Sequence, residues 1–276
     1  MSNRKQLVVN ADDFGFTRDV NQGIIEAHQR GILTAATLMA NGDAFEDAVR
    51  LARENPTLDI GAHLVLLGGR ALTAPHRPLP SSVMPLLAAI ALRRLRVYDE
   101  LAAQVRRILD AGIRVTHLDT HKHTHLAPPV LDAVARISEE FGIRWVRRPF
   151  DLPITAARGA ATRGKRATSD SMAIIRRRFE RTLARRRCKT TDHFAGFQIT
   201  GRFRTEELVA LIRALPEGAT ELMCHPGKCT AELRSAVTRL KQSREDELAA
   251  LTSPEARRAI EESGVELVNY RMLEGA

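Results

Sequence analysis

Four of the nine histidines of this chain lie in the segment THLDTHKHTHLAPP, residues 116–129, at positions 117, 121, 123 and 125. Asp119 stands among them. Imidazole is the commonest metal ligand in proteins and the usual proton-transfer group near neutral pH. This dense cluster predicts metal binding or catalysis, but its spacing alone does not assign a role to each histidine.

Three further polar motifs each follow an apolar run: NADD at 10–13, GAHL at 61–64 and CHPG at 224–227. Each motif is weak when taken singly. Paired aspartates often cap turns, a single histidine in an apolar strand is often a hydrogen-bonded core residue, and His225 could occupy an ordinary turn. Because the carboxyl ends of parallel strands share one face of a sheet, we expect all three motifs to meet the histidine cluster.

The residue types in these motifs are sufficient for metal-assisted hydrolysis. One carboxylate and two imidazoles can hold a metal ion and leave positions for water and substrate. A metal so held polarises a carbonyl group and lowers the pKa of bound water. A second carboxylate can accept the water's proton, and a histidine opposite can protonate the leaving amine. The set therefore predicts hydrolysis of an amide or ester bond.

The elements that must position these motifs alternate between apolar and amphipathic segments. This alternation predicts an α/β fold with a TIM-like (β/α) barrel, regular or distorted, in a single domain over residues 1–276. Two segments that break the alternation, about 68–97 and 153–191, are expected as insertions over the C-terminal face. We expect strands at about 6–13, 34–42, 58–66, 114–123, 143–149 and 220–227, and helices at about 19–31, 43–56, 98–112, 128–142 and 253–264.

Composition narrows the class of protein. The chain has 276 residues, 44% of them hydrophobic, which is enough for a full core. No run of eighteen apolar residues and no secretory signal is visible, so we expect a cytoplasmic protein. The three cysteines do not form a disulfide framework and are expected to be reduced.

The net charge of +9 is concentrated in one stretch. Residues 144–189 contain 15 Lys and Arg but 3 Asp and Glu, which leaves 27 basic and 30 acidic residues elsewhere. Such a block can meet nucleic acid, an anionic membrane or simply water. Nucleic-acid binding is disfavoured, because aromatic residues make up only 4% of the chain and no known binding motif is present.

The motifs VNADDFG, GAHLVL, THLDTHKHTH and MCHPG, in this order, resemble those of the YdjC-like carbohydrate deacetylases. The resemblance extends from Leu7 to about Tyr270. It implies a TIM-like barrel that removes acetyl groups from N-acetylated sugars with one divalent metal ion, magnesium or zinc. Mixed Asp and His ligation is compatible with zinc and also with manganese, nickel or magnesium.

The resemblance also implies roles for single residues. Family members often carry DSHHHVH where this chain has DTHKHTH, so Lys122 replaces a histidine, and His117 is expected to be structural. The implied roles are as follows: Asp13, His63 and His121 as metal ligands, Asp12 as general base, His225 as general acid or its orienting group, Asp119 as support for a ligand histidine, and Lys122, His123 and His125 as substrate contacts.

Within this family, the segment TDHFAGFQITGRF, residues 191–203, and the Arg-rich segment before it resemble the hopanoid-biosynthesis branch, HpnK. This resemblance implies an N-acetylglucosaminyl hopanoid, a glycolipid, as substrate. The alternatives are a soluble chitooligosaccharide substrate or, in another class, a nucleic-acid-binding protein. We expect residues 81–97 and 173–189 to flank the barrel mouth as an apolar groove with a cationic rim, in peripheral contact with the inner face of an anionic membrane. Oligomeric state stays open, a homo-oligomer included.

Overall fold

The computed structural model of the chain describes residues 4–152 and 176–275. Its strands form a single sheet in which every pairing is parallel, in the order β5-β4-β3-β2-β1-β7-β6, with β8 beside β1. The strands are β1 (Lys5–Phe14), β2 (Ala35–Leu38), β3 (Asp59–Leu64), β4 (His117–Thr120), β5 (Trp145–Val146), β6 (His193–Ala195), β7 (Gly218–Cys224) and β8 (Val265–Leu267).

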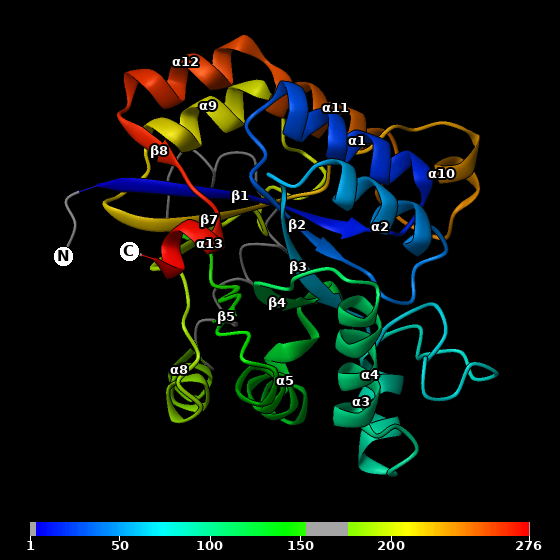
Figure 1. Ribbon diagram of the computed structural model, residues 1–276. Coiled ribbons are helices and arrows are strands. Elements are labelled where there is room, and N and C mark those ends of the chain that lie inside the picture. Colours follow the sequence, from blue (N-terminus) through cyan, green and yellow to red (C-terminus); the bar gives the residue numbers. More distant parts are fainter. Residues whose placement is uncertain (1–3, 153–175, 276) are drawn as a thin grey trace.

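Helices cover the outside of the sheet. In the view of Figure 1 the sheet curls between α1, α9, α11 and α12 above and α4, α5 and α8 below. The helices are α1 (Arg18–Arg30), α2 (Phe45–Glu54), α3 (Val83–Ala91), α4 (Val97–Asp110), α5 (Pro128–Phe141), α8 (Arg176–Arg185), α9 (Thr205–Arg213), α10 (Ala231–Ser235), α11 (Gln242–Thr252), α12 (Pro254–Glu262) and α13 (Tyr270–Glu274), with a 3-10 helix, η1 (His121–Leu126).

The curled parallel sheet confirms the predicted α/β class and the TIM-like barrel in its distorted form. The two edges of the sheet approach each other beyond β5, where isolated parallel bridges join Trp145 to Lys189 and Asp151 to Phe194. The arrangement around β1 is also irregular: β8 pairs with its first residues, Lys5–Leu7, whereas β2 pairs with its second half. Among the described residues, the barrel is therefore joined at this side by single bridges instead of continuous strand pairing.

Local sequence signals explain where the elements begin and end. The Thr17 hydroxyl caps α1 by accepting a hydrogen bond from Val20 N at 3.2 Å. Helix α5 begins with proline, which lacks the amide hydrogen that a first turn leaves unbonded, and it ends at Gly142 in the left-handed region, with φ 69°. The apolar faces then pack into one large core and two smaller clusters, where each fully buried Leu, Ile or Val side chain contributes about 1.5–3 kcal/mol.

Several strands end earlier than their apolar runs predict, and two of these early ends bear on the histidines of the motifs. The expected strand at 114–123 ends at Thr120, and the residues from His121 onward form η1. The expected strand at 220–227 ends at Cys224, so His225 lies in the following loop. Both early ends place histidines after the last residue of a strand. Their side chains therefore need not point alternately to the two faces of the sheet, as they would within a strand.

The two expected insertions differ in how their helices pack against the rest of the protein. Helix α3 in the first is held by Leu86, which is buried, while most of its other side chains face outward. Helix α8 in the second packs beside α5 through the buried side chains of Phe179 and Leu183. The rest of the second segment, residues 153–175, lies outside the described residues. In the described parts of the chain, no helix combines the length and the apolar character needed to cross a membrane.

Candidate metal and catalytic site

The four sequence motifs meet at one end of the sheet, as their positions after parallel strands predict. Asp12 and Asp13 lie near the end of β1, and His63 lies near the end of β3. His121 directly follows β4, and His225 directly follows β7. These strands are close neighbours in the sheet, so the side chains need no long loops to come together.

Three ligand atoms form a nearly equilateral triangle. Asp13 Oδ1 lies 3.3 Å from His63 Nε2 and 3.2 Å from His121 Nδ1. The two ring nitrogens lie 3.2 Å from each other. Ligands bound at 2.0–2.1 Å in a tetrahedral zinc site are separated by roughly 3.3–3.4 Å, and in an octahedral magnesium site by roughly 2.9 Å. The spacing of the three atoms therefore fits a divalent metal ion.

The unsatisfied state of Asp13 Oδ1 also fits a metal ion. This oxygen is buried and accepts no hydrogen bond from the described residues. The other carboxylate oxygen, Oδ2, accepts a hydrogen bond from Arg244 Nη2 at 2.5 Å. Burial by itself would raise the pKa of Asp13, but the Arg244 charge and the two imidazoles lower it well below its usual value. The carboxylate is thus ionised, with one oxygen held by Arg244 and the other left for a cation.

The backbone of Asp13 is bent toward the site. Its φ of 68° lies in the left-handed region, which non-glycine residues rarely adopt. The pairing of β1 with β2 shifts its register between Ala11 and Phe14, around the same position. Such a bulge re-aims a side chain at the end of a strand. The local irregularity turns the Asp13 carboxylate toward His63 and His121.

Asp119 supports His63 from behind. Its Oδ1 lies 2.7 Å from His63 Nδ1, which leaves Nε2 of the same ring facing Asp13. Burial would lower the pKa of His63, but the charges of Asp119 and Asp12 raise it to about 10. A metal ion at Nε2 would take the place of the proton there. Carboxylates that orient metal-binding histidines in this way are common in metal sites.

A second group of possible ligands, Asp12, His63 and Asp119, also lies close together. Its carboxylates already bind a cation, because Arg147 Nη2 donates to Asp12 Oδ1 at 2.6 Å and Nη1 lies 2.6 Å from Asp119 Oδ2. The charge that a metal ion would bring is thus supplied by the guanidinium. The group with Asp13 is the better metal site of the two.

Arg147 belongs to none of the four motifs, and the sequence did not point to it. Its guanidinium group lies among the carboxylates of Asp12, Asp119 and Glu221. The side chain is only 1% exposed, and its Nε also donates to Glu221 Oε1 at 2.7 Å. Burial would raise the pKa of Asp12, but Arg147 and then His63 lower it below its usual value. Arg147 stands just after β5, at the same strand end as the motifs, and that position was the available signal. In the sequence it is hidden in a block of arginines.

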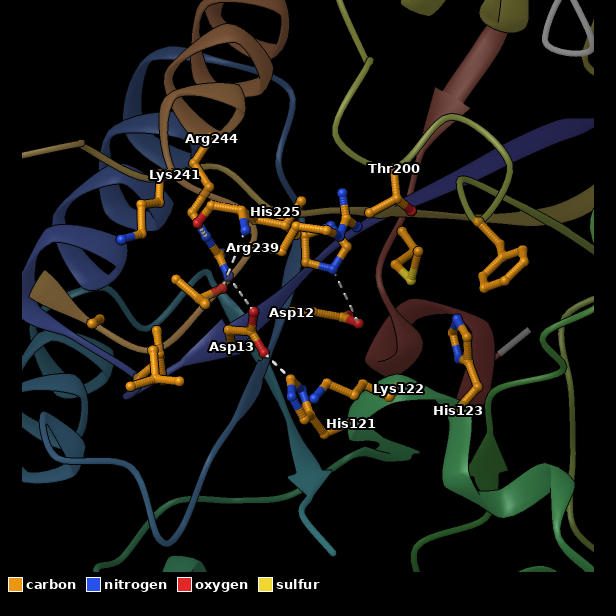
Figure 2. A pocket seen from close by; sticks show the side chains of 17 residues that line it. Asp12, Asp13, His121, Lys122, His123, Thr200, His225, Arg239, Lys241 and Arg244 are labelled. Carbon is orange, nitrogen blue, oxygen red and sulfur yellow. Dashed lines mark hydrogen bonds and ion pairs between the residues drawn. The ribbon is translucent and has the colours of Figure 1, made fainter. Parts of the chain in front are cut away.

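His225 lies beside Asp12 on the pocket wall (Figure 2), with its Nε2 3.9 Å from Asp12 Oδ2. On the other side of the ring, Nδ1 lies 3.8 Å from Glu247 Oε2, and the backbone N–H of His225 donates to the same carboxylate at 2.5 Å. Burial lowers the pKa of His225 to about 4, although Asp12 and Asp13 act in the opposite direction. The ring is therefore placed for proton exchange at the pocket, with Glu247 fixing its loop.

The other histidines of the cluster have separate environments. His123 lines the pocket beside Phe197, at 5.4 Å between ring centroids, and its buried Nδ1 has no hydrogen-bond partner among the described residues. Lys122 lines the pocket as well. His117 is structural, as expected: it stacks on Tyr270 at 3.9 Å and its Nε2 lies 2.9 Å from Asn10 Oδ1.

His125 does not reach the pocket, so the expected substrate contact is not met there. Its Nδ1 lies 2.6 Å from Thr120 Oγ1 and its Nε2 3.1 Å from the carbonyl oxygen of Arg147. The ring is fully buried against Phe179 of α8. Both nitrogens are used to fix η1 to the chain after β5.

The site opens into a cavity of about 610 Å³. Asp12, Asp13, His121 and His225 lie on its wall, as Figure 2 shows, whereas His63 is buried behind them. Apolar side chains on the wall are those of Phe16, Phe197, Met223, Val237 and Leu240. Neither 81–97 nor the described part of 173–189 contributes to this wall, so the expected groove between those segments is wrong in position. Loops after β6 and β7 form the rim instead.

A parallel α/β half-barrel with a carboxylate and two imidazoles at its strand ends defines the class of protein: a barrel with a candidate divalent-metal site. A family model described as YdjC-like protein matches residues 6–262, and the chain belongs to this family. The family predicted from the motifs is thereby confirmed, while the hopanoid branch stays a prediction.

Known relatives match over nearly the whole chain. A carbohydrate deacetylase of Geobacillus stearothermophilus is 35% identical, with 97% of each chain covered. A carbohydrate deacetylase of Brevibacillus brevis is 33% identical, covering 97% of this chain and 99% of the relative. Among solved structures, a protein of Enterococcus faecalis proposed to cleave cellobiose phosphate is 25% identical, with a TM-score of 0.76 and coverage of 98% and 99%. A lactam utilization protein of Thermus thermophilus, at 16% identity and a TM-score of 0.50, shares the fold, with coverage of 95% and 98%.

Proposed function

We propose that this protein is a metal-dependent carbohydrate deacetylase that hydrolyses the N-acetyl amide of a sugar. The observation that carries the proposal is the triangle of Asp13 Oδ1, His63 Nε2 and His121 Nδ1, with its unsatisfied oxygen beside the pocket. The names of the relatives, carbohydrate deacetylases at 35% and 33% identity over nearly the whole chain, support the substrate class.

A divalent ion held by Asp13, His63 and His121 would supply polarisation of the acetyl carbonyl and a lowered pKa for the attacking water. Asp12 faces the pocket as an ionised carboxylate, so it can accept a proton from that water. Arg147 holds both Asp12 oxygens and thereby fixes the direction in which the base acts. Asp119 keeps His63 oriented through its Nδ1.

Breakdown of the amide needs a proton donor near the leaving nitrogen. His225 lies on the pocket wall 3.9 Å from Asp12, and we assign it as the general acid. The water oxygen forms a bond to the acetyl carbon, and the C–N bond breaks. Because the low pKa leaves His225 neutral at rest, the proton that it gives to the leaving nitrogen is the one that Asp12 takes from the water, and the sugar nitrogen leaves as a free amine. The products are acetate and the amino sugar. Lys122 and His123 line the same pocket and are proposed as substrate contacts.

We propose an N-acetylglucosaminyl hopanoid as the substrate, with soluble chitooligosaccharides as the alternative. The cavity of about 610 Å³ is well within the roughly 300–1,000 Å³ of small-molecule sites and can accept more than one sugar ring. Its apolar wall, with Phe197, Met223 and Leu240, suits an apolar aglycone as well as the flat face of a sugar. These features favour a substrate that carries both a sugar and an apolar group.

The test is a deacetylation assay that compares the glucosaminyl hopanoid precursor with diacetylchitobiose, each with and without a chelator. Acetate release from the hopanoid glycolipid, lost with the chelator and restored by a divalent metal, supports the proposal. Efficient turnover of diacetylchitobiose alone would replace the glycolipid by a soluble sugar. No acetate from either substrate, together with salt-sensitive retention on DNA, would favour the nucleic-acid alternative.

A further inference from the structure

Helix α3 exposes an unusual concentration of apolar side chains. Of the seven large hydrophobic residues that are exposed in the described parts of the chain, four lie between residues 83 and 92. Val83 is 51% exposed, Met84 73%, Leu87 37% and Leu92 60%. Leu86, in the same helix, is buried and attaches α3 to the core. Exposed apolar side chains concentrated in one short segment mark a contact surface.

Arginines surround the end of this apolar surface. The chain turns at Arg93, whose φ is 56°, and a cavity of about 870 Å³ lies between the turn and the segment 71–80. The arginines on its wall are Arg77, Arg93, Arg94 and Arg96, and its one acidic residue is Asp99. Arg96 lies 3.6 Å from Asp99, whereas Arg77, Arg93 and Arg94 have no ion-pair partner among the described residues.

Hydrogen bonds to a buried side chain hold one wall of this cavity, the segment 71–80, in place. Glu100, which is fully buried, accepts hydrogen bonds from the backbone N–H groups of Leu72 and Thr73, both at 2.9 Å. It also accepts one from the Thr73 hydroxyl at 2.7 Å. A buried carboxylate therefore holds the start of the segment 71–80 in place, so the arginines line a formed hollow.

We propose that α3 and this arginine-lined cavity dock the protein on an anionic phospholipid bilayer. The apolar side chains of α3 would enter the boundary between headgroups and acyl chains, and Arg77, Arg93 and Arg94 would bind lipid phosphates. At nine residues α3 is too short to cross a bilayer, so it lies in the plane of the interface. Apolar burial combined with cations is what interfacial helices use on anionic membranes.

Charge favours the bilayer over another copy of this chain. In a two-fold symmetric dimer the same patch would meet itself, so that each cluster of unpaired arginines would face the other. Residues 81–98 contain no acidic side chain that could offset this repulsion. An anionic lipid surface supplies both the apolar layer and the negative charge. This inference goes beyond the proposed function, because none of these residues lines the cavity at Asp12 and Asp13.

The test measures flotation of the full-length protein with vesicles of phosphatidylcholine alone or mixed with phosphatidylglycerol. The apolar variant is Met84→Ser with Leu92→Ser, and the cation variant is Arg93→Gln with Arg94→Gln. The matched control is Met272→Ser with Arg258→Gln, which removes one exposed apolar and one exposed cationic side chain elsewhere. Circular dichroism melting checks that each variant folds, and turnover of diacetylchitobiose tests the proposed function separately.

We expect the wild type and the control to float with the mixed vesicles, less so at high salt, and not with phosphatidylcholine. The cation variant should bind at least about tenfold more weakly, since each cation near the surface contributes roughly fivefold. The apolar variant should lose binding to a similar degree. The proposal is overturned if the wild type does not float, or if both α3 variants float as the wild type does. Dissociation of a dimer by the α3 variants, without a change in flotation, would show that the patch binds a second copy.

Discussion

Arg147 donates hydrogen bonds to both carboxylate oxygens of Asp12, at 2.6 Å and 2.8 Å, although 135 residues separate the two in the chain. The same guanidinium also contacts Asp119 and Glu221. It therefore links the proposed general base to the residue that orients a proposed metal ligand. Both links depend on a residue outside the four motifs.

Replacing Arg147 with methionine should destabilise the protein and abolish turnover. Three buried carboxylates would lose their common partner, and breaking a buried ion pair costs about 3–5 kcal/mol. Urea denaturation measures the free energy of unfolding. The control is Arg186→Met, which removes an exposed ion pair with Glu139 and should cost less than about 1 kcal/mol. Equal losses in the two variants would show that the Arg147 cluster contributes no more than a surface pair.

Alanine at Asp13, His63 or His121 should remove metal binding and activity together, because each supplies one corner of the ligand triangle. Metal content after dialysis, measured by mass spectrometry, and metal-dependent thermal stabilisation both report binding. His123→Ala is the matched control, since His123 lines the same pocket outside the triangle. Full metal content in His121→Ala would transfer the third ligand to another histidine of the cluster.

Asp12→Asn should keep the metal and lower turnover by about 10²–10⁴-fold, the usual contribution of a general base. His225→Ala should show a defect of the same order, and it should be larger when the leaving amine is poor. Steady-state acetate release gives the rate, and metal content shows that the site is intact. If Asp12→Asn retains near-normal turnover, the base is another group at the pocket.

Gly23→Ala should lower stability and turnover, because α1 and the loop carrying His225 touch at this point. A Cβ atom on Gly23 would lie 2.3 Å from Gly227 Cα, so the loop would have to shift. The better helix propensity of alanine, about 1 kcal/mol, opposes an overpacking cost of about 1–3 kcal/mol. Thermal melting and acetate release are the measurements. Gly275→Ala is the control, since the nearest atom to a Cβ there lies at 4.0 Å. A more stable, fully active Gly23→Ala would contradict the close contact.

Much of the fold and part of the site follow from local patterns in the sequence. Apolar runs alternating with amphipathic segments predict parallel strands, and parallel strands bring their carboxyl ends to one face. The convergence of Asp12, Asp13, His63 and His225 needs only this rule, since each directly follows or ends an apolar run. The helix boundaries at Thr17 and Gly142 also depend on nearby residues.

The assignments within the histidine cluster depend on the folded chain. Lys122 and His123 have φ values of 54° and 53°, so the chain turns inside η1 in a way that neither helical nor strand periodicity describes. His121 consequently faces Asp13, His123 faces the pocket and His125 faces the core, although their spacing in the sequence is identical.

The environments of Arg147 and α3 are likewise set by long-range packing. Composition places Arg147 among fifteen Lys and Arg residues of one basic block, yet it is buried among three carboxylates from other strands. The apolar segment at 83–92 suits a core helix equally well, yet only part of it is covered by the protein. Whether a charge is paired or an apolar face is covered depends on which distant residues lie opposite. Sequence patterns describe the residue itself, and only the packed chain supplies its neighbours.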